Sequence, residues 1–354
     1  MASTPIASIA GGFSGIFDVL REVDVRPVRA AAETSFTLAF ISRDDLMAQH
    51  LAMLMYRGQR SHDLPRIGTS IALPFADRMA AGYVDIAVIV TRESDHNSDE
   101  IDLVQRLIKA KVPTLVCYVE EVNNPTHGTR VRTQWLPAEV ILLPLGNDNT
   151  LDEAEAIECL VSAIRKMKAV DDLSLGRHLP AFRETVARSL IDDTAFANAA
   201  YTTGTGVLEL NPIATVPLNV ADFVILTKNQ AIMAYKIALA MGLEADFKTV
   251  MPQLATVIGS GFIFRQAARQ LIGLIPGFGI LPKIAVAWAG TYATGEIVYR
   301  FCTTGEKING GAIKQIYEGA LKRGKQIAET LFKRKKRKTE TEEEKRLEIE
   351  RLGD

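Results

Sequence analysis

Five apolar runs of β type, spaced by helical patterns, lie between residues 34 and 146 and constrain the fold most strongly. They read TSFTLAFIS (34–42), IGTSIAL (67–73), VDIAVIVT (84–91), VPTLVCYVE (112–120) and AEVILLPLG (138–146). Helical patterns cover 44–57, 98–110 and 151–168. Nearly continuous apolar strands that alternate with helices are typical of a parallel sheet buried on both faces. Right-handed crossovers then predict an open, doubly wound α/β sheet of about five strands.

The strand signals end near residue 170, and the rest of the chain reads as helical. A length of 354 residues exceeds what one hydrophobic core usually organises, which favours separate domains. Helices are predicted, with Gly and Pro between them, at 178–201, 218–241, 246–258, 262–274, 282–303 and 309–332. We therefore expect a helical lead-in at 1–32, an α/β domain at 33–170, an all-α domain at 171–332 and a charged tail at 333–354.

Charge and cysteine usage exclude several classes of function. The net charge is −1, so we expect no nucleic-acid partner. The three cysteines and five histidines are dispersed, which predicts neither a disulfide framework nor a zinc site. No Lys or Arg precedes Arg21, so the basic start of a secretory signal is missing. A reducing, cytoplasmic location fits this usage.

The turn after the first predicted strand is where an α/β domain of this type would bind a nucleotide phosphate. A working phosphate loop reads GxxxxGK[ST], because each of these residues contacts phosphate or magnesium. Here Ser42 and Met47 replace the glycines, Ala48 replaces the lysine and Gln49 replaces the hydroxyl residue. Asp44 and Asp45 place negative charge at the helix start, where they satisfy free N–H groups and repel phosphate. The turn is a degenerate phosphate loop.

Other nucleotide motifs are also missing. Residues 119–122 carry no [NT]KxD motif for base recognition, and residues 73–77 carry no DxxG motif. We therefore expect no catalytic residue, no cofactor and no metal. A second cluster, Asp95, His96, Asp99 and Glu100, is a weaker candidate for a metal site, because Asp99 and Glu100 suit the first turn of a helix better.

The segments 211–242, 256–279 and 285–301 give the chain a resemblance to a known arrangement. They contain a turn from Pro217 to Asp222 and the element Thr291, Tyr292, Ala293 and Gly295. Over residues 14–305 the chain resembles bacterial Era/Ras-like GTPase proteins that carry a YcjF-type helical domain of unknown function behind the G domain. The resemblance implies a GTPase-like α/β domain, and membrane association as in some members. It supplies no catalytic residues.

Three segments could direct the chain to an anionic membrane. An apolar N-terminal stripe contains Phe13 and Phe17, and residues 270–295 carry Lys283 as their one charge. The Gly and Pro residues within 270–295 favour two short helices over one span. A basic run opens the tail: Lys333, Arg334, Lys335, Lys336, Arg337 and Lys338. One such segment alone gives only marginal attachment, whereas two or more together can hold a protein stably at a membrane. We therefore expect peripheral or hairpin-type association with the cytoplasmic face of an inner membrane.

Two charged groups of the helical part were given structural roles. Asp222 lies in an apolar run, where a hydrogen-bonding role is favoured over an ion or proton site. Arg265 and Arg269 share one helix face and are predicted to pair with Asp222 or Glu296.

The leading hypothesis is a non-catalytic pseudo-GTPase scaffold that binds protein partners, an intact GTPase paralogue among them, or a membrane surface. The first alternative is a nucleotide hydrolase with an unconventional phosphate site. The second alternative is a structural subunit that self-assembles.

Overall fold

The computed structural model describes residues 24–60, 69–91, 98–121, 139–145, 150–202, 220–244, 246, 249–250, 254 and 280–353. The chain divides into two compact units. The α/β unit comprises Pro27–Ala187 with Leu239–Leu243, and the helical unit comprises Arg188–Ala238 and Glu244–Asp354, with the start of the chain to Arg26.

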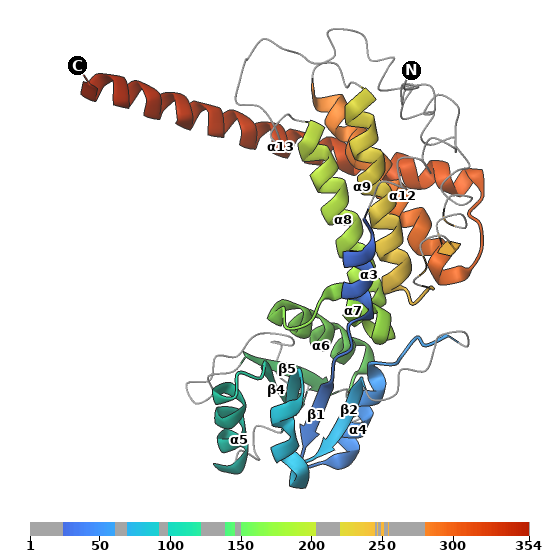
Figure 1. Ribbon diagram of the computed structural model, residues 1–354, viewed down its shortest axis with the longest axis vertical. Helices are drawn as coiled ribbons and strands as arrows, with labels where there is room; N and C mark the ends of the chain where they lie inside the picture. The colour runs from blue at the N-terminus through green and yellow to red at the C-terminus, as the bar shows by residue number, and fades with distance from the viewer. Residues whose placement is uncertain are drawn as a thin grey trace. The chain divides into compact units, whose positions relative to one another are not determined.

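The α/β unit contains a five-stranded sheet with the order β2-β1-β3-β4-β5, in which all pairs are parallel (Figure 1). Its strands are β1 (Leu38–Ser42), β2 (Ser70–Pro74), β3 (Ile86–Thr91), β4 (Thr114–Glu121) and β5 (Glu139–Leu145). Leu38 of β1 lies opposite both Ser70 and Ile86, so β1 pairs with two strands. The predicted α/β class, with an open parallel sheet before a helical part, is confirmed. This strand order reverses direction between β1 and β3, where doubly wound sheets bind ligands.

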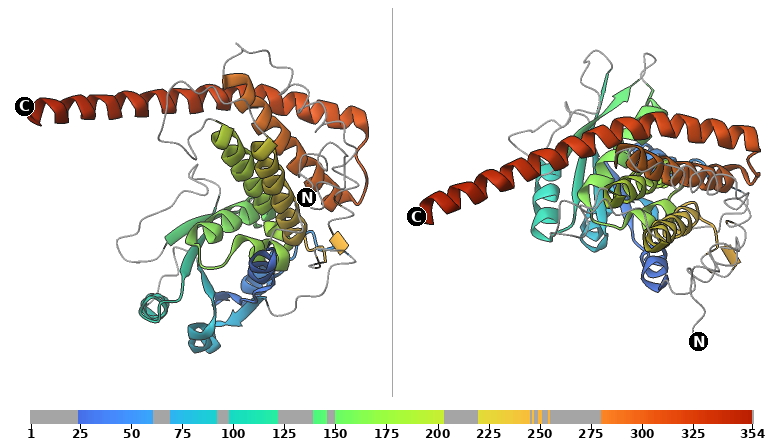
Figure 2. Two further views of the ribbon diagram at one scale, coloured as in Figure 1. Left: turned by 45° about the horizontal axis from the view of Figure 1, so that its top comes forward. Right: turned by 90° about the horizontal axis from the view of Figure 1, so that it is seen from above.

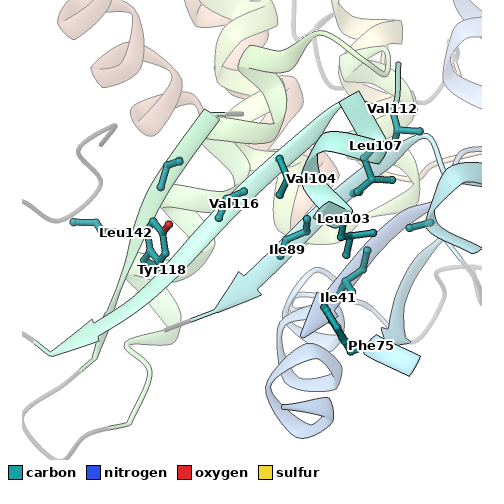
Figure 3. Close-up of a cluster of buried hydrophobic side chains, with 13 residues drawn as sticks. Ile41, Phe75, Ile89, Leu103, Val104, Leu107, Val112, Val116, Tyr118 and Leu142 are labelled. Atoms are coloured by element: carbon teal, nitrogen blue, oxygen red, sulfur yellow. The ribbon is translucent and has the colours of Figure 1, made fainter. Parts of the chain in front are cut away.

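Both faces of the sheet are buried. One face packs against the 3₁₀ helix η1 (Phe75–Tyr83) and α5 (Ser98–Lys109). Figure 3 shows the cluster on this face, which includes Ile41, Ile89 and Val116. Alternate residues of a strand point to the opposite face. On that face α4 (Asp45–Leu54) packs on β1 and β2, and α6 (Glu153–Met167) packs on β5. This double burial explains the apolar runs in the sequence.

The remaining helices of the α/β unit are short. They are α3 (Arg26–Glu33), which lies within the predicted lead-in, α7 (Asp172–His178) and the 3₁₀ helix η3 (Pro180–Phe182). The single helix predicted at 178–201 is wrong at its start. Pro180 forces the preceding Leu179 into an extended conformation, and this residue separates α7 from the helices that follow.

The helical unit contains four long described helices: α8 (Arg183–Thr202, which begins within the α/β unit), α9 (Val220–Ala240), α12 (Ile280–Thr304) and α13 (Gly310–Gly353). The tail predicted to be separate continues α13 without a break. The predicted helices at 246–258 and 262–274 lie almost wholly outside the described residues, as does 270–279 of the predicted hairpin. Residues 280–295 belong to α12. Among the described residues, no helix has the length and apolar character needed to cross a membrane.

Two glycines let the helices of this unit approach closely. A Cβ atom on Gly324 of α13 would lie 2.6 Å from the carbonyl oxygen of Ala285 in α12. A Cβ on Gly295 of α12 would lie 2.6 Å from Cγ1 of Ile191 in α8. Both distances are far below an ordinary contact, so only glycine fits without movement. Small residues at these two helix crossings permit tight packing, and this holds for helices in water and in lipid alike.

Candidate functional site

The strand order brings a small crevice to the carboxyl edge of the sheet, where the chain leaves the paired strands β1 and β3 for helices on opposite faces. Its cavity measures about 70 Å³. The lining residues come from the ends of β1, β3 and β4 and the starts of α4 and α5: Ser42, Arg43, Asp44, Met47, Val90, Thr91, Glu100 and Val119. Ser42 and Met47, two of the residues predicted to replace a phosphate loop, lie in this crevice. Ala48 is buried in α4, and Gln49 of the same helix is exposed.

Asp44 closes the start of α4 with its own side chain. Its Oδ1 accepts hydrogen bonds from the backbone N–H groups of Leu46 and Met47, both at 3.1 Å. Its backbone N–H donates to Oγ of Ser42, also at 3.1 Å. Free N–H groups at a helix start are the usual donors to a bound phosphate. Here a carboxylate occupies two of them, and the predicted capping role of Asp44 is confirmed.

Arg43 connects β1 to the start of α5. Its guanidinium lies 3.1 Å from Oδ2 of Asp99 and 3.4 Å from Oε1 of Glu100. Glu100 is buried, and its Oε2 accepts a hydrogen bond of 2.9 Å from the hydroxyl of Thr91. The guanidinium carbon of Arg43 also lies 4.3 Å from the ring centroid of Phe75. The one arginine lining the crevice is thus held by carboxylates.

The electrostatics of the crevice disfavour an anion. Among the described residues, the crevice is lined by the carboxylates of Asp44 and Glu100 and by the guanidinium of Arg43, and Asp99 beside it pairs with Arg43. The cavity is also smaller than the roughly 300–1,000 Å³ of sites that hold drug-sized ligands. Within the described ranges, no group of acidic, His or Cys side chains has a metal-binding arrangement. Asp95 and His96 of the weighed metal cluster lie outside those ranges.

Sequence reasoning missed Arg43 as the centre of this arrangement. It is 56 residues from Asp99 in the chain, so no local pattern joins them. A signal was present, because Arg43 directly follows β1 while Asp99 and Glu100 follow β3. Knowledge that β1 and β3 are neighbours would have placed these ends together.

Replacing Asp44 with alanine should lower the free energy of unfolding of the α/β unit by about 1 kcal/mol, because two N–H groups of α4 lose their acceptor. Gln49→Ala, an exposed change on the same helix, should alter it by less than about 0.5 kcal/mol. Urea denaturation followed by circular dichroism measures both. Equal effects of the two substitutions would contradict the capping role.

The cysteines offer no reactive nucleophile in the α/β unit. Burial raises the pKa of the Cys117 thiol well above its ordinary value, and nearby Cys159 adds to the effect. The pKa of Cys159 is also raised, by burial and then by Glu155 and Glu158. Since the thiolate reacts, native protein at pH 7.5 should be alkylated by iodoacetamide more slowly than unfolded protein at both residues, and most slowly at Cys117, which is buried. Mass spectrometry of labelled peptides measures this, and equal rates would contradict the burial.

The Thr-Tyr-Ala-x-Gly element serves the packing of the helical unit. The hydroxyl oxygen of Thr291 accepts hydrogen bonds from Asn198 at 2.9 Å and Gln230 at 3.1 Å, and it donates to the carbonyl oxygen of Ala287. These side chains are buried and come from α8, α9 and α12. Buried polar groups that satisfy one another fix how helices align.

Glu296 pairs with two arginines of the described helices, and its predicted pairing with Arg265 or Arg269 stays a prediction. Its carboxylate bonds Arg188 of α8 and Arg300 of α12, the latter at 2.7 Å. The predicted partners Arg265 and Arg269, and the side chain of Asp222, lie outside the described residues. Glu296 is therefore an ion-pairing residue between helices, because Arg188 and Arg300 are both close enough to neutralise it.

Comparison with known proteins adds no relative: no family model, no curated protein and no solved structure matches this chain.

Proposed function

We propose that this protein is a non-catalytic scaffold whose GTPase-like α/β unit binds protein partners instead of hydrolysing a nucleotide. The observation that carries the proposal is the pairing of Arg43 with Asp99 and Glu100 in the crevice between β1 and β3. Phosphoryl transfer needs positive groups directed at the phosphates. The capping of α4 by Asp44 supports the same proposal, because it directs a negative charge to the place where phosphate would approach.

The proposal fits a subunit that keeps an α/β architecture for recognition. An intact GTPase with a similar helical domain is the partner that the sequence resemblance suggests. Such a pair would combine one active and one inactive subunit in the cytoplasm.

Steady-state hydrolysis of GTP and ATP with magnesium tests the non-catalytic role. We expect the purified protein, and its Ser42→Ala and Gln49→Ala variants, to release phosphate at the rate of the buffer alone. Turnover by the wild type that either substitution abolishes would favour the alternative, a hydrolase with an unconventional phosphate site. Of the two substitutions, Gln49→Ala is less disruptive to the fold, because the Gln49 side chain is exposed.

An anionic membrane is a second candidate partner, favoured by the basic run that begins at Lys333, an exposed residue of α13. Each basic residue near an anionic surface contributes about 1 kcal/mol. Phe13 and Phe17, the other predicted contacts, lie outside the described residues. Flotation with anionic and neutral vesicles at low salt tests this role. We expect recovery with anionic vesicles that falls as salt rises, since exposed charges are screened; full recovery in the soluble fraction would contradict it.

A further inference from the structure

Helix α13 continues well past the part that packs on α12. The apolar residues that contact the core of the helical unit end with Leu331: Tyr317, Leu321, Ile327 and Leu331. Phe332 and Lys333 are exposed. Figures 1 and 2 show α13 continuing beyond α12 as a single helix to its end at Gly353. We call residues 333–353 the arm; it spans about 31 Å at 1.5 Å per residue.

The charges of the arm are sorted into two blocks. Residues 333–338 are all Lys or Arg, and residues 340–344 contain Glu340, Glu342, Glu343 and Glu344. Residues 333–346 include no apolar residue. A helix that is polar on every side is stable in water when opposite charges recur three or four residues apart. The sorted blocks of the arm depart from that pattern.

Sorting the charges makes residues 333–344 of the arm unfavourable as a lone helix. Like charges stand four residues apart at Lys333 and Arg337, at Arg334 and Lys338, and at Glu340 and Glu344. Such pairs destabilise a helix by about as much as opposite pairs stabilise it. Within residues 333–344 the opposite pairs four apart, Lys336 with Glu340 and Lys338 with Glu342, have the basic residue first, which is the weaker order. Glu342 with Arg346, at the end of the acidic block, has the acidic residue first. A partner of complementary charge would relieve this repulsion.

We propose that the arm pairs with the arm of a second copy of this chain, in antiparallel orientation. A two-fold axis at Thr339 places each basic block at the height of the other copy's acidic block. Four matched heights are of opposite charge: Arg334 with Glu344, Lys335 with Glu343, Lys336 with Glu342, and Lys338 with Glu340. Arg337 comes level with Thr341, and Lys333 with Lys345 is the one like pair within 333–345. A parallel pair in register would place like charges together. A two-fold contact of this kind is self-complementary and closes at a dimer.

The acidic block favours this partner over the anionic membrane given above as the second candidate, and it weakens the vesicle binding expected there. An anionic membrane would attract residues 333–338 but repel Glu340 and Glu342–Glu344, which directly follow. A second copy satisfies both blocks together. The inference does not rest on the crevice, so a nucleotide-binding result and an association result can fail independently.

Sedimentation velocity of the full chain tests the pairing. We expect reversible dimers at about 50 mM salt whose Kd rises at least about tenfold at about 500 mM, because exposed charges are screened. An acidic variant carries Lys335→Glu, Lys336→Glu and Arg337→Glu. A basic variant carries Glu342→Lys, Glu343→Lys and Glu344→Lys. Each variant alone should dimerise at least about tenfold more weakly than the wild type, because like charges then face each other.

An equimolar mixture of the two variants is the decisive experiment, since the acidic blocks of one variant then meet the basic blocks of the other. We expect the mixture to restore association. A matched control, Lys314→Glu with Lys322→Glu and Lys325→Glu, makes the same change in net charge at exposed residues of α13 outside the arm and should leave Kd unchanged.

Three results would overturn the pairing: a monomeric wild type at every concentration, an acidic variant that associates like the wild type, or a mixture that stays monomeric. A monomeric wild type whose basic variant binds phosphatidylserine vesicles more tightly would assign the arm to a membrane.

Discussion

Replacing Trp288 with alanine should lower the free energy of unfolding of the helical unit by about 3–5 kcal/mol, the range for deletion of a large buried aromatic side chain. Trp288 is 2% exposed and belongs to the core formed by α8, α12 and α13. Its ring stacks on Tyr292 with 4.8 Å between centroids, and the guanidinium carbon of Arg323 lies 5.3 Å away. Alanine would leave a cavity and remove both contacts.

Phe196→Ala is the matched control for this substitution. Phe196 is also an aromatic residue of the helical unit, but it is 41% exposed, so its loss should cost much less, about 1 kcal/mol at most. Urea denaturation monitored by circular dichroism compares the two variants with the wild type. Equal destabilisation by both substitutions would contradict the assigned core.

Gly324→Ala should be the second most damaging of the substitutions considered. The added methyl carbon would lie 2.6 Å from the carbonyl oxygen of Ala285, so α12 and α13 must move apart. Overpacking of this kind costs about 1–3 kcal/mol. The cost exceeds the gain of up to about 1 kcal/mol that alanine brings to a helix interior. We therefore expect a net loss of about 1–2 kcal/mol.

Gly319→Ala separates the two contributions, because both glycines lie within α13. A Cβ at Gly319 would meet no atom within 4 Å, so only the helix-propensity gain remains. This variant should be more stable than the wild type by up to about 1 kcal/mol. Opposite shifts of the thermal midpoint in the two variants are the expected result. A shift in the same direction would contradict the close crossing of α12 and α13.

The features that follow from local sequence could be predicted. Buried strands appear in the sequence as apolar runs, which is why β1, β3, β4 and β5 could be predicted, and the partly buried edge strand β2 also keeps an apolar run at Ile71–Leu73. Asp44 caps α4 through groups two and three residues away, so its role was also visible. Thr291 was noted only within a motif, because its partners Asn198 and Gln230 are 93 and 61 residues distant in the chain.

Non-local features could not be obtained in this way. The right-handed crossover rule limits the possible topologies, but it does not say on which side of the sheet each new strand is added. The order β2-β1-β3-β4-β5 therefore had to be observed. The ion pairs of Arg43 depend on that order. The charged tail differs from the preceding residues in composition, yet its backbone continues α13 as one helix, because composition marks a change of surroundings and not of backbone conformation.

Equilibrium titration with GTP and magnesium, by calorimetry, tests the central claim that the crevice between β1 and β3 has no phosphate-binding chemistry. Before the titration, a separate sample of the same preparation is denatured, and its supernatant is analysed for nucleotide that was bound during purification. We predict no nucleotide in the supernatant and no saturable heat up to about 1 mM GTP, a limit that corresponds to about −4 kcal/mol of binding free energy. Stoichiometric nucleotide in the supernatant, or saturable binding that Ser42→Ala weakens, would contradict the account.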